Sequence, residues 1–342
     1  MRNPSLIRSV DFFTGQELAK ERFGRLVHCR SDQVAIIPSV SYGLKSAISN
    51  VPLNNGNHAI TISDEFPSDY NTLSEWCRKN QKQLRVVRAP DLRPGRGKLW
   101  TEQIIDAITP DTAALVMSAI HWMDGTKFNL EAIGQKCREC HAIFIVDGSQ
   151  SVGVLPIDVV KNQIDALICT GYKWLFGPYS IGLAYYGESF DTGLPIEDSW
   201  MNRTNAEDFT RLTEYVEGYK NGAARYNMGE SSQFILLPMM NRALEQILDW
   251  QDESVQSYCG DLVKPLLQWL RENNYWIEED AYRANHLLGF LLPKEKSRDG
   301  FLKRLKENKI FVSVRGNIIR VSTHLFNTET DIEQLIQVLQ SS

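Results

Sequence analysis

One lysine of this 342-residue chain, Lys173, lies among aromatic residues in the stretch DALICTGYKWLFGP, residues 165–178. A lysine ammonium is strongly hydrated, so a lysine held among tryptophan, phenylalanine and tyrosine is a candidate for an amine that reacts in its neutral form. A carboxylate, Asp147, follows the apolar run AIFIV. Two further stretches could take part in chemistry: SVSYG at 39–43 carries hydroxyl side chains, and EFPSDY at 65–70 contains an aromatic residue, Phe66.

These four features together match what pyridoxal phosphate needs from a protein. An amine forms a Schiff base with its aldehyde, a carboxylate keeps the pyridine nitrogen protonated, an aromatic ring covers one face, and a helix N-terminus holds the phosphate. The chain offers candidates for these roles in the same order: Lys173, Asp147, Phe66 and the 39–43 turn. Taken singly, each has an ordinary explanation as a turn, cap or core residue. Their combination indicates a cofactor site.

Composition argues against several other classes. A net charge of −5 and 43% hydrophobic residues give no basic surface for nucleic acid. We find no apolar run of the roughly 18 residues that a membrane helix needs, and no secretory signal. Six cysteines without an export signal indicate reduced thiols and a cytoplasmic location. We expect no metal, because CRECH at 137–141 is typical of a helix end and lacks a second cysteine pair.

Short apolar runs alternate with amphipathic stretches between residues 33 and 187, which predicts a mostly parallel sheet with helices on both faces. The predicted strands are QVAIIPS (33–39), HAITIS (58–63), QLRVVRA (83–89), AALVMSAI (113–120), AIFIVD (142–147), DALICT (165–170) and IGLAYYG (181–187). Ligands gather at the carboxyl ends of the strands in such sheets. The spacing of Asp147 and Lys173 suits two adjacent strands joined by one crossover.

The pattern changes after residue 230. A long helical stretch at 235–273 is followed by two strand-like runs, HLLGFLLP and NIIRVST, and by a final helix at 328–340. This order predicts a smaller α+β domain behind a large α/β domain. We predict a helical segment at 1–30 packed with the small domain, a large cofactor-binding domain at 31–235, and a small domain at 236–342.

The stretch IVDGSQSVGVLPIDVVKNQIDALICTGYKWLFGPYSIGLAYY, residues 145–186, resembles the signature of the class V aminotransferase family. That family has fold type I and includes cysteine desulfurases, kynureninases and isopenicillin-N-epimerase-like enzymes. The resemblance runs from about residue 33 to about residue 330. It implies a pyridoxal phosphate enzyme that acts on an amino acid through a Schiff base on Lys173, with Asp147 as the partner of the pyridine nitrogen. It also implies that Gln150 hydrogen-bonds the phenolic oxygen of the cofactor.

Further cofactor contacts carry over from the same resemblance. Phe66 and Asp69 match a kynureninase segment in which the phenylalanine stacks on the cofactor and the aspartate hydrogen-bonds near it. The resemblance also implies two groups of phosphate contacts: Val40, Ser41 and Tyr42 at the helix start, and Thr170 and Tyr172 just before the lysine.

Two later segments extend the implied site. RYNMGESS, residues 225–232, matches a turn that reaches the neighbouring subunit's phosphate site, which implies a homodimer with shared active sites and contacts from Gly229 and Ser231. Glu230 departs from the usual threonine, and a carboxylate would repel a phosphate. NIIRVST matches the pattern that assigns Arg320 to the substrate α-carboxylate. Arg315 has either a structural role or that of a second anion contact.

The resemblance leaves the reaction open, and the residues rank the options. A cysteine desulfurase needs a cysteine on a mobile loop shortly before the carboxylate-binding arginine, whereas NKIFVSVRGNII at 308–319 contains none and Cys259 lies in a helical context. Gln150 disfavours a kynureninase, which has histidine there. The epimerase-like and aminotransferase branch remains, and we expect transamination or epimerisation. His121 is interpreted as a turn residue rather than an acid/base group.

Two alternatives stay open. One is a lyase that breaks a C–S or C–C bond by β-elimination or in the manner of kynureninase, which the FPSD match favours. The other is a non-catalytic protein that keeps the fold for binding or assembly. Relatives usually have an N-terminal segment before the helix that we predict at 15–27, and this segment often contributes to the substrate pocket.

Overall fold

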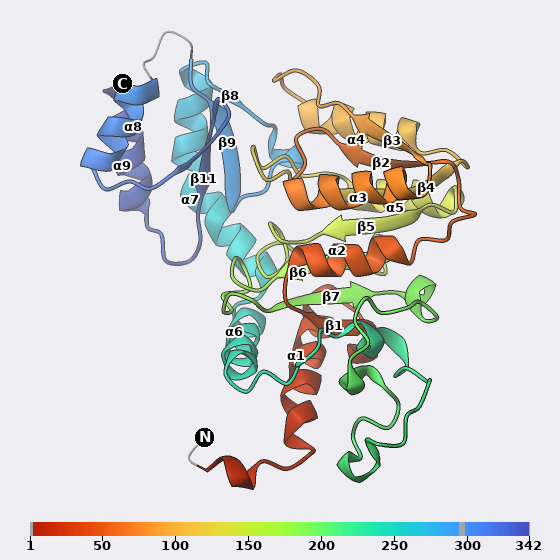
Figure 1. The fold of residues 1–342 in the computed structure, drawn as a ribbon. Coiled ribbons are helices and arrows are strands. Elements are labelled where there is room, and N and C mark those ends of the chain that lie inside the picture. The colour runs from red at the N-terminus through yellow and green to blue at the C-terminus, as the bar shows by residue number, and fades with distance from the viewer. Residues whose placement is uncertain (1–2, 294–297, 342) are drawn as a thin grey trace.

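Seven strands of the large domain form one sheet in the computed structural model, which describes residues 3–293 and 298–341 (Figure 1). Their bounds are β1 Val34–Ile37, β2 His58–Ile62, β3 Gln83–Val87, β4 Thr112–Ser118, β5 Ile143–Asp147, β6 Ala166–Thr170 and β7 Gly182–Tyr186. The spatial order is β1-β7-β6-β5-β4-β2-β3. Pairs that include β7 are antiparallel and all the others are parallel. The predicted strands and the mostly parallel sheet are confirmed.

Alternating side chains divide the large domain into two cores. In β1, Ile36 faces one core, whereas Ala35 and Ile37 face the other. Four helices cover the first face: α1 Asp11–Val27, α4 Arg96–Ala107, α5 Leu130–Glu139 and α6 Leu236–Trp250. Two helices, α2 Val40–Ser49 and α3 Pro67–Lys79, cover the second face and lie in front of the sheet in Figure 1. Burial on both faces explains why most strands read as continuous apolar runs.

Helix starts follow local sequence signals. Ser39 caps α2, since its hydroxyl accepts a hydrogen bond from the Tyr42 N–H. Pro67 occupies the first turn of α3, and the side chain of Asn129 caps α5. The predicted helical stretch at 235–273 is divided into two helices at Gln251, whose φ is 61°.

The small domain is built on a four-stranded antiparallel sheet. Its strands, in the spatial order β10-β11-β9-β8, are β8 Trp276–Ile277, β9 Leu287–Leu291, β10 Ser313–Arg315 and β11 Ile318–Ser322. Three helices pack on it to form its core: α7 Asp252–Glu272, α8 Arg298–Glu307 and α9 Glu329–Gln340. The structure also contains short 3-10 helices at Pro4–Leu6, Ser31–Gln33, Glu188–Phe190, Trp200–Asn202, Phe209–Arg211, Gly222–Tyr226 and Asp280–Tyr282.

The N-terminal helix α1 packs against α6 and against β1 and β7. Buried residues of α1 and α6, such as Phe23 and Leu244, belong to the same core as the large sheet. The domain limits at 30 and 235 remain a prediction, and this packing associates α6 with the large sheet. Among the described residues, every helix is too short or too polar to pass through a lipid bilayer.

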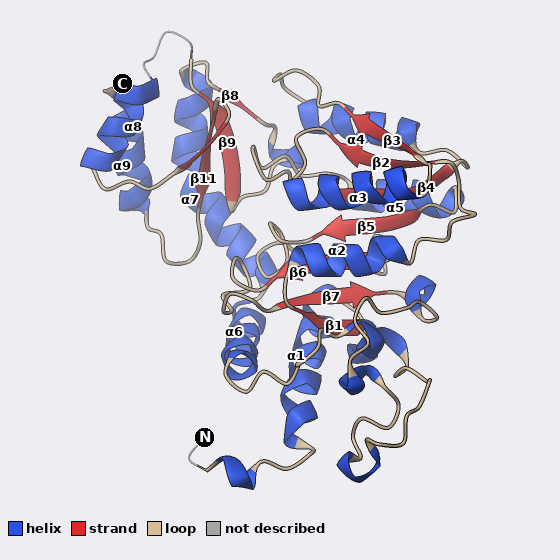
Figure 2. Cartoon of the chain, viewed as in Figure 1, coloured by secondary structure: helices blue, strands red, loops and turns tan. Residues whose placement is uncertain are grey.

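The carboxyl ends of the parallel strands face the small domain. In Figure 2 the arrowheads of β2 and β5 point toward the small domain, whereas that of β7 points away. β5 and β6 are adjacent and parallel, with Asp147 opposite Ile168. The two strand ends that carry Asp147 and Lys173 are therefore neighbours, as the sequence spacing predicts.

Candidate active site

A cavity of about 290 Å³ opens at the carboxyl ends of β5 and β6. Its lining residues are Pro38, Ser39, Val40, Ser41, Phe66, Ser68, Asp147, Ser149, Thr170, Tyr172, Lys173, Tyr179, Ser180 and Ile181. The predicted amine, carboxylate, stacking ring and helix start all line this one space. A planar group placed in it can meet all four kinds of side chain at once.

Lys173 lies in the turn that follows β6. Its Nζ is 5.5 Å from the centre of the Phe66 ring and 5.9 Å from that of Tyr172. Burial lowers the pKa of Lys173, and the negative charge of Asp147 only partly opposes this effect. Gly171 allows the turn, because a Cβ at this position would overlap the Ile181 carbonyl. The amine is thus held in an environment that favours its neutral, nucleophilic form, as the aromatic residues around it predict.

Asp147 is the last residue of β5 and its side chain is buried. Its Oδ1 accepts a hydrogen bond of 2.7 Å from the Ser149 N–H. The Ser149 hydroxyl in turn accepts one of 3.3 Å from the Thr170 N–H at the end of β6. This link fixes the two strand ends relative to each other. The sequence analysis did not assign Ser149 a role, although it lies within the VDGSQS stretch.

The N-terminus of α2 forms one wall of the cavity. The Ser39 and Ser41 hydroxyl oxygens are 3.0 Å apart, and both residues line the space together with Val40. N–H groups in the first turn of a helix have no intrahelical acceptor, and the helix dipole favours an anion there. Thr170 and Tyr172 line the same cavity. This arrangement can hold a phosphate group.

Phe66 directly precedes α3, and its ring lies between the amine and a second aromatic residue. The rings of Phe66 and Trp122 meet edge to face, with centroids 5.6 Å apart. The Trp122 Nε1–H donates to the Asp64 carbonyl at 2.7 Å, which fixes the indole. Together the two rings form a nonpolar wall that extends from Lys173 to Trp122.

A group of buried carboxyl groups lies behind Asp147. Both carboxyl oxygens of Asp69 are buried without a hydrogen-bond partner among the described residues. Burial, followed by the charges of Asp147 and Glu65, raises the pKa of Asp69 well above its usual range. Burial also raises the pKa of Glu65, whose Oε2 accepts hydrogen bonds from the N–H and hydroxyl of Ser118. The raised pKa favours the protonated form of Asp69, which does not line the cavity.

Three further predicted residues lie outside the cavity lining. The Tyr42 ring turns toward Glu197, and burial followed by the charge of Glu197 raises the Tyr42 pKa. Glu197 also accepts a 2.5 Å hydrogen bond from the Gly229 N–H. Ser231 is fully buried, and its hydroxyl faces the Met201 sulfur at 3.9 Å. Tyr42 and Gly229 are thus brought together by a carboxylate that sequence reasoning missed, whereas Ser231 points into the protein interior.

Gln150 is nearly buried and its Oε1 accepts a hydrogen bond of 3.1 Å from the Trp174 Nε1–H. Its backbone carbonyl oxygen lies 2.8 Å from the His286 Nε2. The side-chain amide nitrogen of Gln150 takes part in neither contact, so it can donate a hydrogen bond to another acceptor. Gln150 does not line the cavity.

The small domain contributes two arginines near Trp122. Arg320 donates to the Trp122 carbonyl oxygen at 2.6 Å, and the Arg315 guanidinium lies 5.5 Å from the centre of the Trp122 ring. Burial, followed by the charge of Arg315, lowers the pKa of Arg320 to about 10. The charge of Arg320 also helps to lower the pKa of Lys173, so the arginine and the amine share one electrostatic environment.

His121 belongs to a buried polar network. Its Nδ1 lies 3.0 Å from Asp124 Oδ1, and Asp124 Oδ2 accepts a 2.6 Å hydrogen bond from Arg96. Burial opposes the charged imidazole, but Asp124 and Glu65 together outweigh this effect and raise the His121 pKa. The His121 N–H also donates to the Thr126 carbonyl across the turn. These contacts fit a turn residue, although Nε2 has no hydrogen-bond partner among the described residues.

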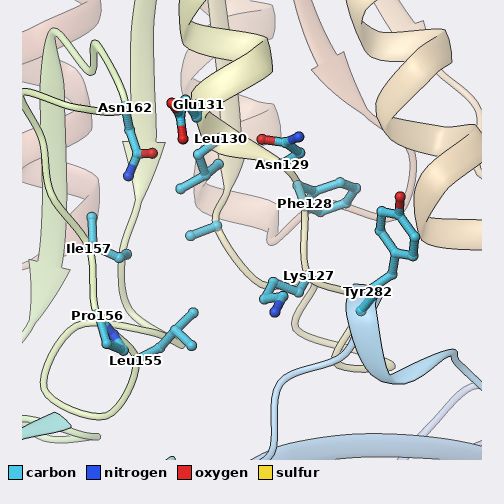
Figure 3. A pocket seen from close by; sticks show the side chains of 12 residues that line it. Lys127, Phe128, Asn129, Leu130, Glu131, Leu155, Pro156, Ile157, Asn162 and Tyr282 are labelled. Carbon is cyan, nitrogen blue, oxygen red and sulfur yellow. The ribbon is translucent and has the colours of Figure 1, made fainter. Parts of the chain in front are cut away.

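A second, larger cavity of about 510 Å³ shares no lining residue with the first (Figure 3). Lys127 and Tyr282 lie on one side of it, and Leu155, Pro156 and Ile157 lie on the other. Its lining contains a lysine, Lys127, but no aspartate or glutamate at the end of a strand. The smaller cavity is therefore the candidate active site. The described part of the chain nowhere gathers three His, Cys, Asp or Glu side chains in the manner of a metal site.

The fold and the cavity define the class as fold type I enzymes that depend on pyridoxal phosphate. Residues 7–335 match the model of the family "Aminotransferase class-V", and the chain belongs to that family. Among curated relatives, the uncharacterized aminotransferase YcbU of Bacillus subtilis is 24% identical, over 94% of this chain and 82% of the relative. Isopenicillin N epimerase of Amycolatopsis lactamdurans is also 24% identical, over 94% and 83%.

Solved structures agree on the fold. A variant of C-DES with glycine covalently linked to its pyridoxal phosphate cofactor superposes with a TM-score of 0.83 at 17% identity, over 98% of this chain and 88% of that one. As a member of the class V aminotransferase family, the present enzyme has pyridoxal phosphate as its cofactor. The residues of the smaller cavity fit this cofactor. They include an amine whose pKa is lowered by burial, a buried carboxylate, an aromatic ring and a helix N-terminus.

Proposed function

We propose that this enzyme transforms the α-carbon of an amino acid by transamination or epimerisation, with Lys173 as its catalytic residue. One observation supports the proposal above the others: Lys173 and Asp147 line the same small cavity from adjacent parallel strands, and burial lowers the pKa of the lysine. Pyridoxal phosphate, when bound, supplies a ring that accepts the electron pair released at the substrate α-carbon.

The chain's own residues have distinct roles in this proposal. The Nζ of Lys173 holds the cofactor covalently and later moves the proton of the substrate α-carbon. The carboxylate of Asp147 faces the pyridine nitrogen and keeps a proton on it. The Phe66 ring covers one face and excludes water.

Anions are held by two further groups of residues. We propose that the phosphate lies at the start of α2 and contacts Val40, Ser41, Thr170 and Tyr172, which line the cavity. Arg320 binds the substrate α-carboxylate from the small domain. The hydrogen bond from Arg320 to the Trp122 carbonyl oxygen, next to the Phe66 ring of the cavity wall, supports this role.

Contacts around the cysteines argue against desulfuration. Cys259 is fully buried in α7, and its Sγ donates to the Thr323 carbonyl oxygen at 3.5 Å. Burial raises the pKa of Cys259, which keeps the thiol protonated. The residues before Arg320 form a tight β10–β11 hairpin without cysteine. Neither feature supplies a mobile thiolate.

A lyase is the second candidate function. The Phe66 and Asp69 pair supports it, since Phe66 lines the proposed cofactor site and Asp69 lies near Asp147, although Asp69 does not line the cavity. A non-catalytic role is the third, and the placement of Lys173, Asp147 and Phe66 around one cavity argues against it.

One experiment separates these functions. The purified enzyme loaded with cofactor is reduced with borohydride, and the modified residue is mapped by mass spectrometry. We expect the label on Lys173, and a colourless protein that cannot be reconstituted supports the non-catalytic alternative.

The loaded enzyme is then incubated with a pool of amino acids. Keto acid formed only with an added acceptor indicates transamination, α-deuterium exchange alone indicates epimerisation, and pyruvate or a thiol released without an acceptor indicates a lyase.

We also propose a cytoplasmic homodimer. All six cysteines are free thiols, which suits a reducing compartment.

The dimer proposal is supported by a group of exposed apolar side chains around Phe12. The Phe12 ring meets those of Phe209 and Phe234 edge to face, and Ile235 nearby in sequence is 76% exposed. Light scattering should give twice the chain mass, and Ile235→Glu should shift it toward the monomer.

A further inference from the structure

Arg315 and Arg320 are diagonal neighbours on one face of the small-domain sheet. Ser313 of β10 stands opposite Arg320 of β11, and Arg315 lies two residues beyond Ser313 on the same strand. Side chains two residues apart leave a strand on the same side, so both guanidiniums leave the sheet in one direction. Both reach Trp122, which Arg320 contacts through the carbonyl oxygen and Arg315 through the ring.

The protein does not neutralise this pair of charges. Neither arginine takes part in an ion pair formed among the described residues, whereas buried Arg96 is paired with Asp124. The Nε atoms of both Arg315 and Arg320 are buried without a hydrogen-bond partner in the described ranges. The positive charge of Arg315 also disfavours the charged form of Arg320. Two like charges held together without a counter-ion indicate a site that receives an anion from solution.

We propose that Arg315 binds a second acidic group of the substrate, so that this enzyme acts on amino acids with an acid group in the side chain. The inference rests on the proposed function, in which the substrate amine lies near Lys173 and Arg320 binds the substrate α-carboxylate. Diagonal positions on a sheet are roughly 7–8 Å apart at the backbone, a separation that suits two acid groups on one small molecule.

The wall between the amine and the arginines supports the same substrate class. The Phe66 ring contacts Lys173 on one side and the Trp122 ring on the other. A short carbon chain can lie along these rings while its two acid groups reach the guanidiniums. A guanidinium matches a carboxylate geometrically and forms charge-assisted hydrogen bonds with it. A neutral side chain would leave the half-buried Arg315 guanidinium without an anion.

Binding of acids that lack an amine tests the inference without catalysis. Calorimetry on the cofactor-loaded enzyme compares glutarate and succinate with butyrate, for the native chain and for Arg315→Gln, Arg315→Lys and Arg271→Gln. The last variant is the control, since Arg271 is a small-domain arginine already paired with Asp280. We expect the dicarboxylates to bind about 10-fold to 100-fold more tightly than butyrate to the native enzyme and to the control.

The Arg315→Gln variant should lose this preference and bind butyrate within about twofold of the native enzyme, and Arg315→Lys should keep part of it. Equal binding of mono- and dicarboxylates to the native enzyme, or no binding of either, overturns the inference. A loss of butyrate and glutarate affinity by the same factor in Arg315→Gln also overturns it, because both arginines then hold one carboxylate. The proposed function is judged separately, by borohydride labelling of Lys173 and by α-deuterium exchange with a pool of neutral and acidic amino acids.

Discussion

The carboxyl group of Asp69 lies beside that of Asp147, and the two cannot both be charged at low cost in a buried setting. Burial and the charge of Asp147 raise the pKa of Asp69, whose side chain is fully buried. Asp147 is held in place by the Ser149 N–H. The raised pKa therefore favours a protonated Asp69 next to the carboxyl group of Asp147.

A prediction about stability follows for Asp69→Asn. An unfolded aspartate has a pKa of about 3.9. Between that value and the raised folded pKa, the folded protein binds more protons than the unfolded chain, so Asp69 lowers the free energy of unfolding as pH rises. The variant should gain stability relative to the native chain by up to about 1.4 kcal/mol per pH unit above pH 4. Urea denaturation of the cofactor-free protein at several pH values measures this. Exposed Asp191→Asn is the control, and a pH-independent difference for Asp69→Asn contradicts the prediction.

Lys173→Ala should abolish the visible absorbance of the bound cofactor while the fold persists. The lysine is only partly buried in a cavity, so its truncation leaves space that is already open to ligand. We expect turnover to fall by at least about 100-fold. Lys127→Ala is a matched control, since burial also lowers the Lys127 pKa and this lysine lines the other cavity. Absorbance and circular dichroism of both variants test the prediction, which fails if Lys173→Ala keeps the chromophore or the activity.

Asp147→Asn should weaken cofactor binding and slow the steps that remove the α-proton. The neutral amide cannot keep the pyridine nitrogen protonated, and a charge-assisted hydrogen bond contributes roughly 1.5–3 kcal/mol. This corresponds to a loss of about 10-fold to 100-fold in cofactor affinity. Titration of the cofactor-free variant, followed by absorbance, gives the affinity. Ser149→Ala is a useful comparison, because it removes the link to Thr170 but keeps the carboxylate, and native-like binding by Asp147→Asn would contradict the assignment.

The strands and the central pair of residues could be predicted because their signals are local. β4, β5 and β6 are almost wholly buried, so each is a continuous apolar run, and the residue after such a run must lie at the sheet edge. The small domain was less predictable. Strands β8 and β10 have two and three residues, too few to show a period. The break between α6 and α7 falls on Gln251, with neither glycine nor proline to signal it.

Several features of the site could not be predicted from the sequence because they depend on contacts between distant segments. Tyr42 does not line the cavity, and Glu197, far along the chain, lies near its hydroxyl group. Ser231 enters the interior to meet Met201, whereas the family resemblance implies a contact with the neighbouring subunit's phosphate site. Trp122 joins the site through contacts with Phe66 and with two arginines of the other domain. No periodicity or local motif reports such pairings, since each depends on how separate elements pack.

The network around Asp124 is expected to be a principal contributor to stability. Asp124 is fully buried between His121 and Arg96, and although burial opposes its charge, these two partners lower its pKa. Asp124→Asn leaves the Arg96 guanidinium buried without its counter-ion, which should reduce the free energy of unfolding by about 3–5 kcal/mol at pH 7. A lowered carboxyl pKa contributes stability that is present above the unfolded pKa and is lost as the pH falls, so the deficit of the variant should shrink below about pH 4.

Denaturation of Asp124→Asn at pH 7 and at acidic pH measures both effects. Asp261→Asn serves as the control, since it removes an exposed ion pair with Lys264 and should change stability by no more than about 1 kcal/mol. A loss for Asp124→Asn as small as that of the control would mean that the buried ion pair contributes no more than an exposed one. The turn that carries Trp122 would then be held chiefly by its backbone hydrogen bonds and by packing against the small domain.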